Sequence, residues 1–380
     1  MRIYLDHNAT TPVRDEVADA MDRATRECFG NPSSVHAEGA AARAAVERAR
    51  AQVASLLCCA PGDVLFTGGA SEANNTALLR VGEALPGRHL VTTNVEHPSI
   101  EAPLETLADR GWRITRLPVD AGGRVGAESV SAALEDDTAL VSLIWANNET
   151  GVLLPLAEIA QAVAAHPAKL HVDATQAVGK WPLDLARVPI DLLSLTGHKF
   201  GGPKGVGALV VRGVPAFEPL LRGGPQEGRR RAGTENVAGI VGLGAACALA
   251  ERELPERVRR YAELRDRLWA GIQAKVPDVR RNGDPEHVLP NTLNVTFLHT
   301  AGELLLQALD LEGVAVSSGA ACSSGSIEPS RVLVALGLSP EDARGTLRFS
   351  VGHGNDEAQI DRVLALLPDL LARVREAEPV

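Results

Sequence analysis

The sequence predicts an α/β protein with a mostly parallel central sheet covered by helices and a smaller α+β domain. Short apolar runs alternate with amphipathic helical patterns at 64–67, 90–93, 139–145, 170–172, 192–195 and 208–211. Uninterrupted apolar strands of this kind are typical of a parallel sheet that is buried on both faces. Beyond residue 250 the pattern changes to a charged helix over 251–275, and then to alternating strands at 292–297 and 346–350. Alternation predicts that each of these two strands has one solvated face.

The chain length and this change of pattern predict two domains. A chain of 380 residues is long enough for two domains of roughly 150 residues or more. We expect a large domain over 16–255 and a smaller domain formed by 1–15 together with 256–380. The charged helix, interrupted only near Pro255, should lead from the first domain into the second.

The composition excludes several classes of protein. Apolar residues make up 45% of the chain and charged residues 23%, as in a globular rather than a disordered or fibrous protein. The net charge of -10 argues against nonspecific binding to nucleic acid or to an anionic membrane. Apolar runs fall short of the roughly 18 to 20 residues of a membrane span, and the N-terminus does not resemble a signal peptide. We expect a cytoplasmic protein with neither membrane nor nucleic acid as a partner.

The five cysteines do not form a disulfide framework or a zinc site, because their number is odd and no C-x-x-C pair occurs. Four of them are expected to be small, buried hydrophobic residues, namely Cys28, Cys58, Cys59 and Cys247. Cys322 stands instead in a glycine- and serine-rich segment, 317–326, which favours a mobile loop. Its thiol is either an incidental loop residue or a nucleophile. We expect no metal ligands.

The chain has only five lysines, so an amine that forms a Schiff base must come from a short list. Lys169, Lys180 and Lys275 are expected to be solvated surface charges. Lys169, for example, opens a predicted strand at the end of the sheet opposite the usual ligand site. Lys199 and Lys204, both within 196–205, remain as candidates.

Three further candidates follow predicted strands, where ligands of open α/β sheets bind. The segment 68–75 opens a helix with two glycines, so it is either a phosphate site or a tight turn with an N-cap. Asp173 could pair with a pyridinium nitrogen or cap the next helix, and His97 could stack on a ring, move protons or be structural. With a scarce lysine, these residues match what pyridoxal 5'-phosphate requires: a phosphate anchor, a ring-nitrogen partner, a stacking group and an amine.

The segment 194–207, which contains Lys199, resembles the cofactor-attachment motif of class V aminotransferase-fold enzymes, which have PLP fold type I. More closely, the chain resembles the cysteine desulfurases of the group that serves iron-sulfur cluster assembly. The resemblance extends nearly from end to end, through the motifs at 4–12, 31–36, 147–151, 171–176, 231–234, 318–322, 328–330 and 347–350.

The resemblance implies a role for each matching residue. Lys199 would bind the cofactor covalently and shuttle protons, His97 would stack on the cofactor ring, and Cys322 would take up sulfur as a persulfide. Asn148 and Arg348 would hold the substrate carboxylate, for which arginine provides a bidentate fork. The remaining cofactor-binding residues would be Ala70, Ser71, Thr196 and His198 at the phosphate, Asp173 at the ring nitrogen, Gln176 at the ring oxygen, and Thr234 from the partner subunit of a homodimer. The family often has threonine at position 71 and serine at position 196, and both replacements keep a hydroxyl.

The implied activity is conversion of L-cysteine to L-alanine, with the Cys322 persulfide passed to a sulfur acceptor such as an iron-sulfur scaffold. A selenocysteine lyase and a small-amino-acid aminotransferase are alternatives within the same fold, although an aminotransferase has no use for a thiol at 322. A noncatalytic scaffold or adaptor would predict loss of the lysine, yet Lys199 is present. The three arginines at 229–231 are too small a cluster to indicate nucleic acid. The sequence leaves the sulfur acceptor open among a cluster scaffold, transfer-RNA thiolation, cofactor sulfuration and DNA sulfur modification.

Overall fold

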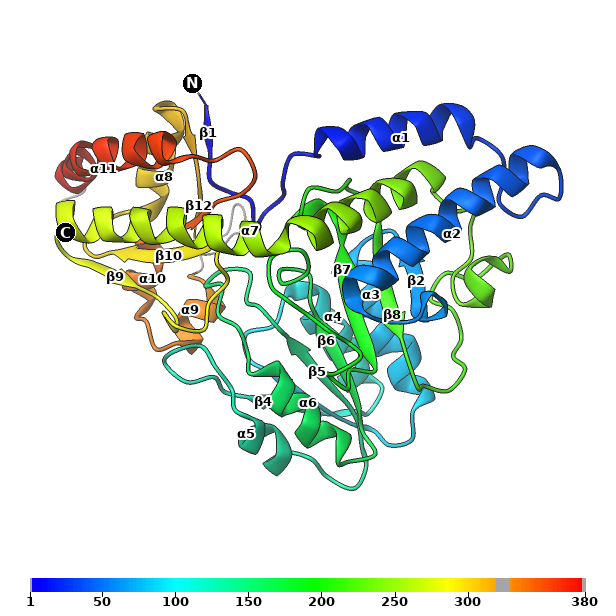
Figure 1. Ribbon diagram of the computed structural model, residues 1–380. Helices are drawn as coiled ribbons and strands as arrows, with labels where there is room; N and C mark the ends of the chain where they lie inside the picture. The colour runs from blue at the N-terminus through cyan, green and yellow to red at the C-terminus, as the bar shows by residue number, and fades with distance from the viewer. Residues whose placement is uncertain (1, 319–328, 378–380) are drawn as a thin grey trace.

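The computed structural model describes residues 2–318 and 329–377. Within these residues the main sheet has seven strands in the order β2-β8-β7-β6-β5-β3-β4 (Figure 1). Neighbouring strands are parallel except where β8 runs antiparallel to β2 and β7, so the predicted mostly parallel sheet is confirmed. The strands are β2 (Val64–Thr67), β3 (His89–Thr93), β4 (Arg113–Leu117), β5 (Thr138–Ile144), β6 (Lys169–Asp173), β7 (Leu192–Thr196) and β8 (Gly207–Val211).

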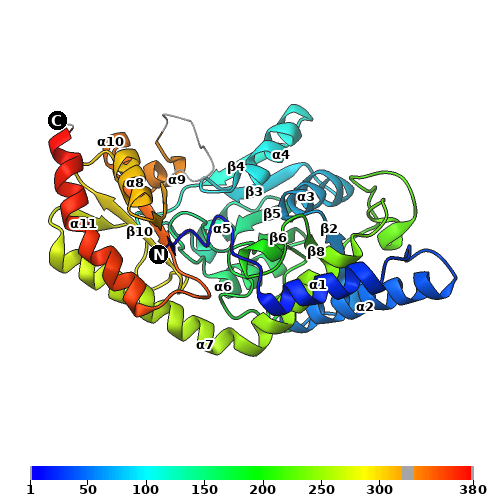
Figure 2. The ribbon, with the colours of Figure 1, turned by 90° about the horizontal axis from the view of Figure 1, so that it is seen from above.

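Helices cover both faces of this sheet, because successive side chains of each strand point to opposite sides and both sides are apolar. In β5, for example, Val141 packs in one core and Leu140 in the other. One face carries α1 (Asp15–Glu27), α2 (Ala37–Leu57), α5 (Ala127–Ala132), α6 (Leu156–Ala164) and the first part of α7 (Val237–Lys275). The other face carries α3 (Ala70–Thr76), its π-helical continuation η2 (Ala77–Gly82) and α4 (Pro98–Asp109), as Figure 2 shows. Three short 3-10 turns complete this unit, η1 (Pro61–Asp63), η3 (Gly197–Lys199) and η4 (Gln226–Arg229).

A smaller unit is built on the antiparallel sheet β12-β13-β10-β9. The first strand of the chain, β1 (Ile3–Tyr4), pairs with β11, so the N-terminal segment lies in this unit (Figure 1). The other elements are β9 (Val279–Arg281), β10 (Thr292–Phe297), α8 (Gly302–Leu311), β11 (Val314–Ala315), β12 (Ser317–Ser318), α9 (Arg331–Ala335), α10 (Pro340–Arg344), β13 (Thr346–Ser350) and α11 (Glu357–Ala377).

Both faces of β10 and β13 are buried, so the predicted solvated face is wrong. Leu293 and Phe349 pack in the apolar core of the smaller unit, as alternation requires. On the opposite face of the two strands, Asn294 and Arg348 contact the large unit instead of water. Asn294 donates to the main-chain oxygen of Glu149 at 3.1 Å, and Arg348 to that of Asn148 at 2.9 Å. These buried hydrogen bonds replace the hydrogen bonds to water that a solvated face would make.

Helix α7 runs without interruption for 39 residues and joins the two units (Figure 1). The interruption predicted near Pro255 is wrong. Pro255 is exposed, so water can satisfy the carbonyl that loses its helical donor there. Glu253, two residues before the proline, forms salt bridges with Arg14 and with Arg257, each at 2.9 Å. These ion pairs stabilise the helix on both sides of Pro255. Among the helices that the structure describes, none combines the length and apolarity needed to cross a membrane.

The cysteines differ in burial. Cys247 is buried as predicted, whereas Cys28 and Cys59 are partly exposed. Cys58 is exposed, so its predicted burial is wrong. It is the C-cap of α2 and has the left-handed conformation, with φ of 54°. Cys322 lies outside the described residues.

Candidate active site

A cavity of about 660 Å³ opens beyond the carboxyl ends of the parallel strands. Its wall is formed by segments that follow β2, β3, β5, β6 and β7, and by Arg348 of β13. This is the position at which open α/β sheets bind ligands, and its volume suits a cofactor with a small substrate. The predicted site residues that line the cavity are Ala70, Ser71, His97, Asn148, Asp173, Gln176, Thr196, His198, Lys199 and Arg348. Thr234 is exposed and does not line it.

Lys199 reaches the cavity from the turn η3, which follows β7. The hydroxyl of Thr196 donates to the main-chain oxygen of Val206 at 2.9 Å and fixes the end of that strand. The Lys199 Nζ donates to the main-chain oxygens of Asn8 and Ala9, at 2.7 and 2.8 Å. The N-terminal segment therefore holds the amine at the edge of the cavity.

Asp173 ends β6 and is almost fully buried, with 3% of its surface exposed. Its carboxylate accepts hydrogen bonds from Asn74 Nδ2 at 2.9 Å and from the main-chain N–H of Thr175 at 3.0 Å. Both donors are neutral, so they stabilise an ionised carboxylate only in part. A cationic ring nitrogen in the cavity would complete its surroundings.

His97 begins α4, and its ring is fixed by that helix. Its Nδ1 accepts from the main-chain N–H of Ser99 at 3.1 Å and lies 2.8 Å from the Ser99 hydroxyl. Burial lowers the pKa of His97; the charge of Asp173 opposes this effect and that of Lys199 adds to it. The imidazole is therefore neutral at neutral pH, which suits a ring stack.

The turn between β2 and α3, where the sequence predicts a phosphate, is a narrow cradle in the wall of the cavity. Gly69 has φ of 153°, which L side chains rarely adopt. A Cβ atom at Gly207 would lie 2.8 Å from the carbonyl carbon of Gly69, so only glycine allows the two segments to approach this closely. Beside the cradle, His198 Nδ1 lies 3.2 Å from the Thr10 hydroxyl. Burial and the charge of Lys199 lower the pKa of His198 to about 4, so it is a neutral group there.

Sequence reasoning missed the carboxylate beside this cradle. Glu72 accepts from the main-chain N–H of Gly68 at 2.7 Å, and it pairs with Arg231 at 2.9 Å. The arginine compensates a negative charge that would otherwise repel a phosphate. The sequence could have indicated Glu72, because acidic residues favour the first turn of a helix.

Arg348 is 1% exposed and is fixed on two sides. Its Nη2 pairs with Asp6 at 2.6 Å, and its Nη1 donates to the main-chain oxygen of Asn148 at 2.9 Å. Its buried Nε has no hydrogen-bond partner among the described residues. An unpaired buried donor costs about 1 to 3 kcal/mol. Arg348 also lines the cavity, so its guanidinium fits a substrate with a carboxylate group.

Lys180 was predicted to be a surface charge, which is wrong. Only 3% of its surface is exposed. Its Nζ donates to Gln176 Oε1 at 2.8 Å and to Asn8 Oδ1 at 3.3 Å. Spacing could have indicated the contact with Gln176, because residues four apart in a helical turn lie side by side.

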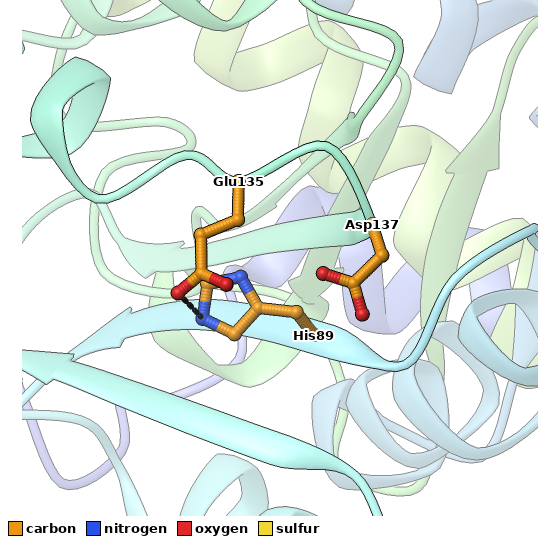
Figure 3. Close-up of side chains that lie close together, drawn as sticks. All are labelled: His89, Glu135 and Asp137. Atoms are coloured by element: carbon orange, nitrogen blue, oxygen red, sulfur yellow. Dashed lines mark ion pairs between the residues drawn. The ribbon is translucent and has the colours of Figure 1, made fainter.

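A second group of titratable residues lies at the other end of the sheet, where His89 approaches Glu135 and Asp137 (Figure 3). Arg113 already pairs with both carboxylates, at 2.6 and 2.5 Å. The two ring nitrogens of His89 each lie 2.8 Å from a threonine hydroxyl. Because its ligand atoms are already engaged, this group does not indicate a metal site.

Glu96 gives the stability of the protein a testable pH dependence. Its Oε1 accepts from the Thr93 hydroxyl at 2.7 Å and from the Ile144 N–H at 3.0 Å, while its Oε2 has no partner in the described part of the chain. Burial raises the pKa of Glu96 to about 8. The folded state therefore holds this proton more tightly than the unfolded state, so the contribution of Glu96 to stability is greatest at low pH and is lost as the pH rises through about 8.

We expect Glu96→Gln to remove this decline, because glutamine does not ionise. Its advantage over the wild type in unfolding free energy should grow by about 2 to 3 kcal/mol between pH 6 and pH 9. Denaturant unfolding at both pH values measures this difference. Glu105→Gln, an exposed change on the neighbouring helix α4, is the matched control. An advantage that is independent of pH would show that Glu96 is ionised in the folded protein throughout this range.

Comparison with known proteins agrees with this geometry. The family described as aminotransferase class-V matches residues 3–363. "Cysteine desulfurase NifS" of Azotobacter vinelandii is 45% identical over 379 residues, covering 99% of this chain and 94% of that protein. The solved structure "NIFS-LIKE PROTEIN" has a TM-score of 0.92 at 35% identity, covering 98% of this chain and 100% of that one. "SspA in complex with cysteine" has a TM-score of 0.80 at 34% identity, covering 92% and 99%. This chain therefore belongs to the aminotransferase class-V family and, within it, to the cysteine desulfurases.

Proposed function

We propose that the protein removes sulfur from L-cysteine, releases L-alanine and carries the sulfur as a persulfide on Cys322. The observation that carries this proposal is the buried, partly unpaired guanidinium of Arg348 in the same cavity as Lys199 and Asp173. Together they provide a site for an amino acid carboxylate beside an amine. The solved relative in complex with cysteine supports cysteine as the substrate.

The cavity residues fit pyridoxal 5'-phosphate. Ala70, Ser71, Thr196 and His198 would hold its phosphate, Asp173 its ring nitrogen and Gln176 its ring oxygen, with His97 against the ring. Thr234, exposed in one subunit, would complete the phosphate site of a partner in a homodimer. When bound, the cofactor withdraws electrons from the α-carbon of the substrate.

The residues of the chain then have defined tasks. Arg348 orients the substrate through its carboxylate, with Asn148 beside it, and Asp6 keeps the guanidinium in place. Lys199 Nζ, at the edge of the cavity, takes up the proton that leaves the α-carbon and returns a proton to the carbon product. His97 can assist the proton transfer at sulfur, because its imidazole is neutral at neutral pH.

Sulfur transfer requires a nucleophile on the protein. The Cys322 thiolate attacks the substrate sulfur, and an S–S bond forms as the C–S bond breaks. The electron pair of the C–S bond stays on the carbon fragment, which is protonated and leaves as L-alanine. The persulfide sulfur is oxidised and the carbon is reduced by the same two electrons, so no external oxidant is needed.

The proposal includes three further expectations. The protein acts in the cytoplasm, and its persulfide is passed to an acceptor protein such as an iron-sulfur scaffold. It consists of a large cofactor-binding domain over 16–255 and a smaller domain of 1–15 with 256–380. The continuation of the polar contacts of β10 and β13 into the large unit supports a site formed between the two domains.

Cys322→Ser tests this function. We expect it to abolish persulfide formation from L-cysteine while the visible absorbance of the bound cofactor stays intact, because serine cannot accept sulfur. Sulfur-35 cysteine labelling and chromatographic analysis of alanine are the measurements. Cys58→Ser, at an exposed cysteine outside the cavity, is the control and should keep both activities. Persistent alanine production with a persulfide on another cysteine would contradict the role of Cys322, and keto-acid production would indicate an aminotransferase.

A further inference from the structure

The buried amine of Lys180 is not explained by packing. Among the described residues no carboxylate pairs with it, and both its hydrogen bonds go to side-chain amide oxygens. The charged or titratable groups around it are Lys199 and His198 of η3, Arg348 of β13, His7 of the N-terminal segment and Arg257 of α7. Burial, and then the charges of Lys199 and Arg348, lower the pKa of Lys180. For stability alone, an apolar side chain of similar length would serve as well or better.

The partners of Lys180 lie in the wall of the main cavity. Gln176 is held by both ends of its amide, because Oε1 accepts from Lys180 at 2.8 Å and Nε2 donates to the main-chain oxygen of Asn8 at 2.9 Å. The same oxygen of Asn8 accepts from Lys199 Nζ at 2.7 Å. Lys180 thus supports two residues, one of which contacts the amine of Lys199 directly.

The Asn8 side chain is fixed in the same way. Its Oδ1 accepts from Lys180 and from Asn291 Nδ2, the latter at 3.0 Å, and its Nδ2 donates to the Thr292 hydroxyl at 2.9 Å. Each polar atom of this amide has a partner, and Lys180 supplies one of two donors to its oxygen. A buried network of this kind holds a single arrangement only while its members remain satisfied.

Lys180 also separates two cavities. A second cavity of about 360 Å³ is lined by Lys180 and Lys199 together with His7, Arg257 and Tyr261. Lys199 lines the main cavity as well, as do Asn8 and Gln176, the two partners of Lys180. The Lys180 side chain therefore lies between the second cavity and the wall that orients Lys199.

We propose that Lys180 is a positioning residue of the cofactor site, which fixes Gln176 and Asn8 by donating hydrogen bonds to their amide oxygens. This inference rests on the proposed function, in which Gln176 contacts the cofactor and Asn8 orients Lys199. Lys180 acts through these two residues and does not touch the substrate. Its donated hydrogen bonds are the property required, so a shorter neutral side chain with an N–H donor should replace it better than an apolar one.

Two variants separate the effect of the hydrogen bonds that Lys180 donates from the effect of its packing. Lys180→Met keeps the length of the side chain and removes the donor, while Lys180→Gln keeps an N–H donor without the charge. We expect Lys180→Met to weaken pyridoxal 5'-phosphate binding by about tenfold, the effect of one hydrogen bond to a buried polar group, and to lower kcat. Lys180→Gln should bind the cofactor more tightly than Lys180→Met, because it keeps an N–H donor on a slightly shorter side chain. Absorbance titration of the apoprotein with pyridoxal 5'-phosphate measures affinity, and thermal melting of the apoproteins reports folding.

The controls make each outcome decisive. Lys169→Met removes the lysine that opens β6 and pairs with Asp191 at 2.9 Å, and it should leave cofactor affinity unchanged. If Lys180→Met does not fold, Lys180→Leu takes its place with the same expected results. Wild-type affinity and kcat in the apolar variant would overturn the proposal, as would a Lys180→Gln protein that binds the cofactor more weakly than Lys180→Met. If wild-type protein neither binds pyridoxal 5'-phosphate nor forms alanine, the proposed function itself fails; if it does both, only the role of Lys180 is tested.

Discussion

Lys199→Ala should reduce alanine formation from L-cysteine by about 10⁴-fold or more, because it removes both the amine that binds the cofactor and the proton carrier. Its effect on folding should be small. The Lys199 Nζ donates to two main-chain oxygens, and the loss of two such bonds lowers the unfolding free energy by only about 1 to 3 kcal/mol. Chromatographic analysis of alanine and thermal melting together separate the two effects.

Lys204→Ala is the matched control for this prediction. Lys204 lies in the same segment and lines the same cavity, but its side chain is exposed. We expect this variant to retain activity within about threefold of wild type, as for most surface substitutions. The reverse result, with Lys204 essential and Lys199 dispensable, would reassign the amine.

Arg348→Lys should raise the KM for L-cysteine by about 10²-fold, because lysine keeps the charge but cannot form a fork. The wild-type guanidinium is bound by Asp6 and by the main-chain oxygen of Asn148, which fix its fork at the wall of the cavity. A lysine ammonium cannot keep both of these contacts and reach the substrate as well. Steady-state kinetics with L-cysteine measures the change.

Two variants complete the test of Arg348. Asp6→Asn keeps a hydrogen-bond acceptor for the guanidinium and removes the charge, so we expect a smaller rise in KM. Arg344→Lys, at an exposed arginine in the last turn of α10, should change neither KM nor kcat. An unchanged KM in Arg348→Lys, together with a lower melting temperature, would mean that Arg348 only stabilises the fold.

The buried strands of the main sheet could be predicted because apolar packing on both faces requires an uninterrupted run of apolar residues. The edge strand β4 could not be predicted from the same pattern, since it carries Arg113 and Arg116, which form ion pairs at the surface. At an edge, one side of the strand lacks a neighbour, and polar side chains replace the apolar run. Apolar periodicity therefore detects strands that are buried, the edge strand β2 included, and misses an edge strand whose side chains reach the surface.

The predicted site residues gather because strands of one direction end at one edge of the sheet. This rule brings Asp173, His97 and Lys199 to one cavity. It could not place Lys180, because its burial depends on amide oxygens contributed by two separate segments of the chain. Composition makes an exposed lysine the ordinary case. Contacts between Asn8 and the rest of the site likewise depend on pairing of the N-terminal segment with the smaller unit.

Because α7 is uninterrupted, residues cannot be inserted into it or deleted from it without moving the two units relative to each other. Residues Ile240 and Leu243 of this helix pack in the core of the large unit, and Leu264 and Leu268 pack in that of the smaller one. A single residue inserted between these pairs would turn one packing surface by about 100° relative to the other and move it by about 1.5 Å. The helix thus fixes both the distance and the relative rotation of its two packing surfaces. Surface loops tolerate such insertions, but an insertion in α7 would move Arg348 of the smaller unit relative to Lys199 of the large unit.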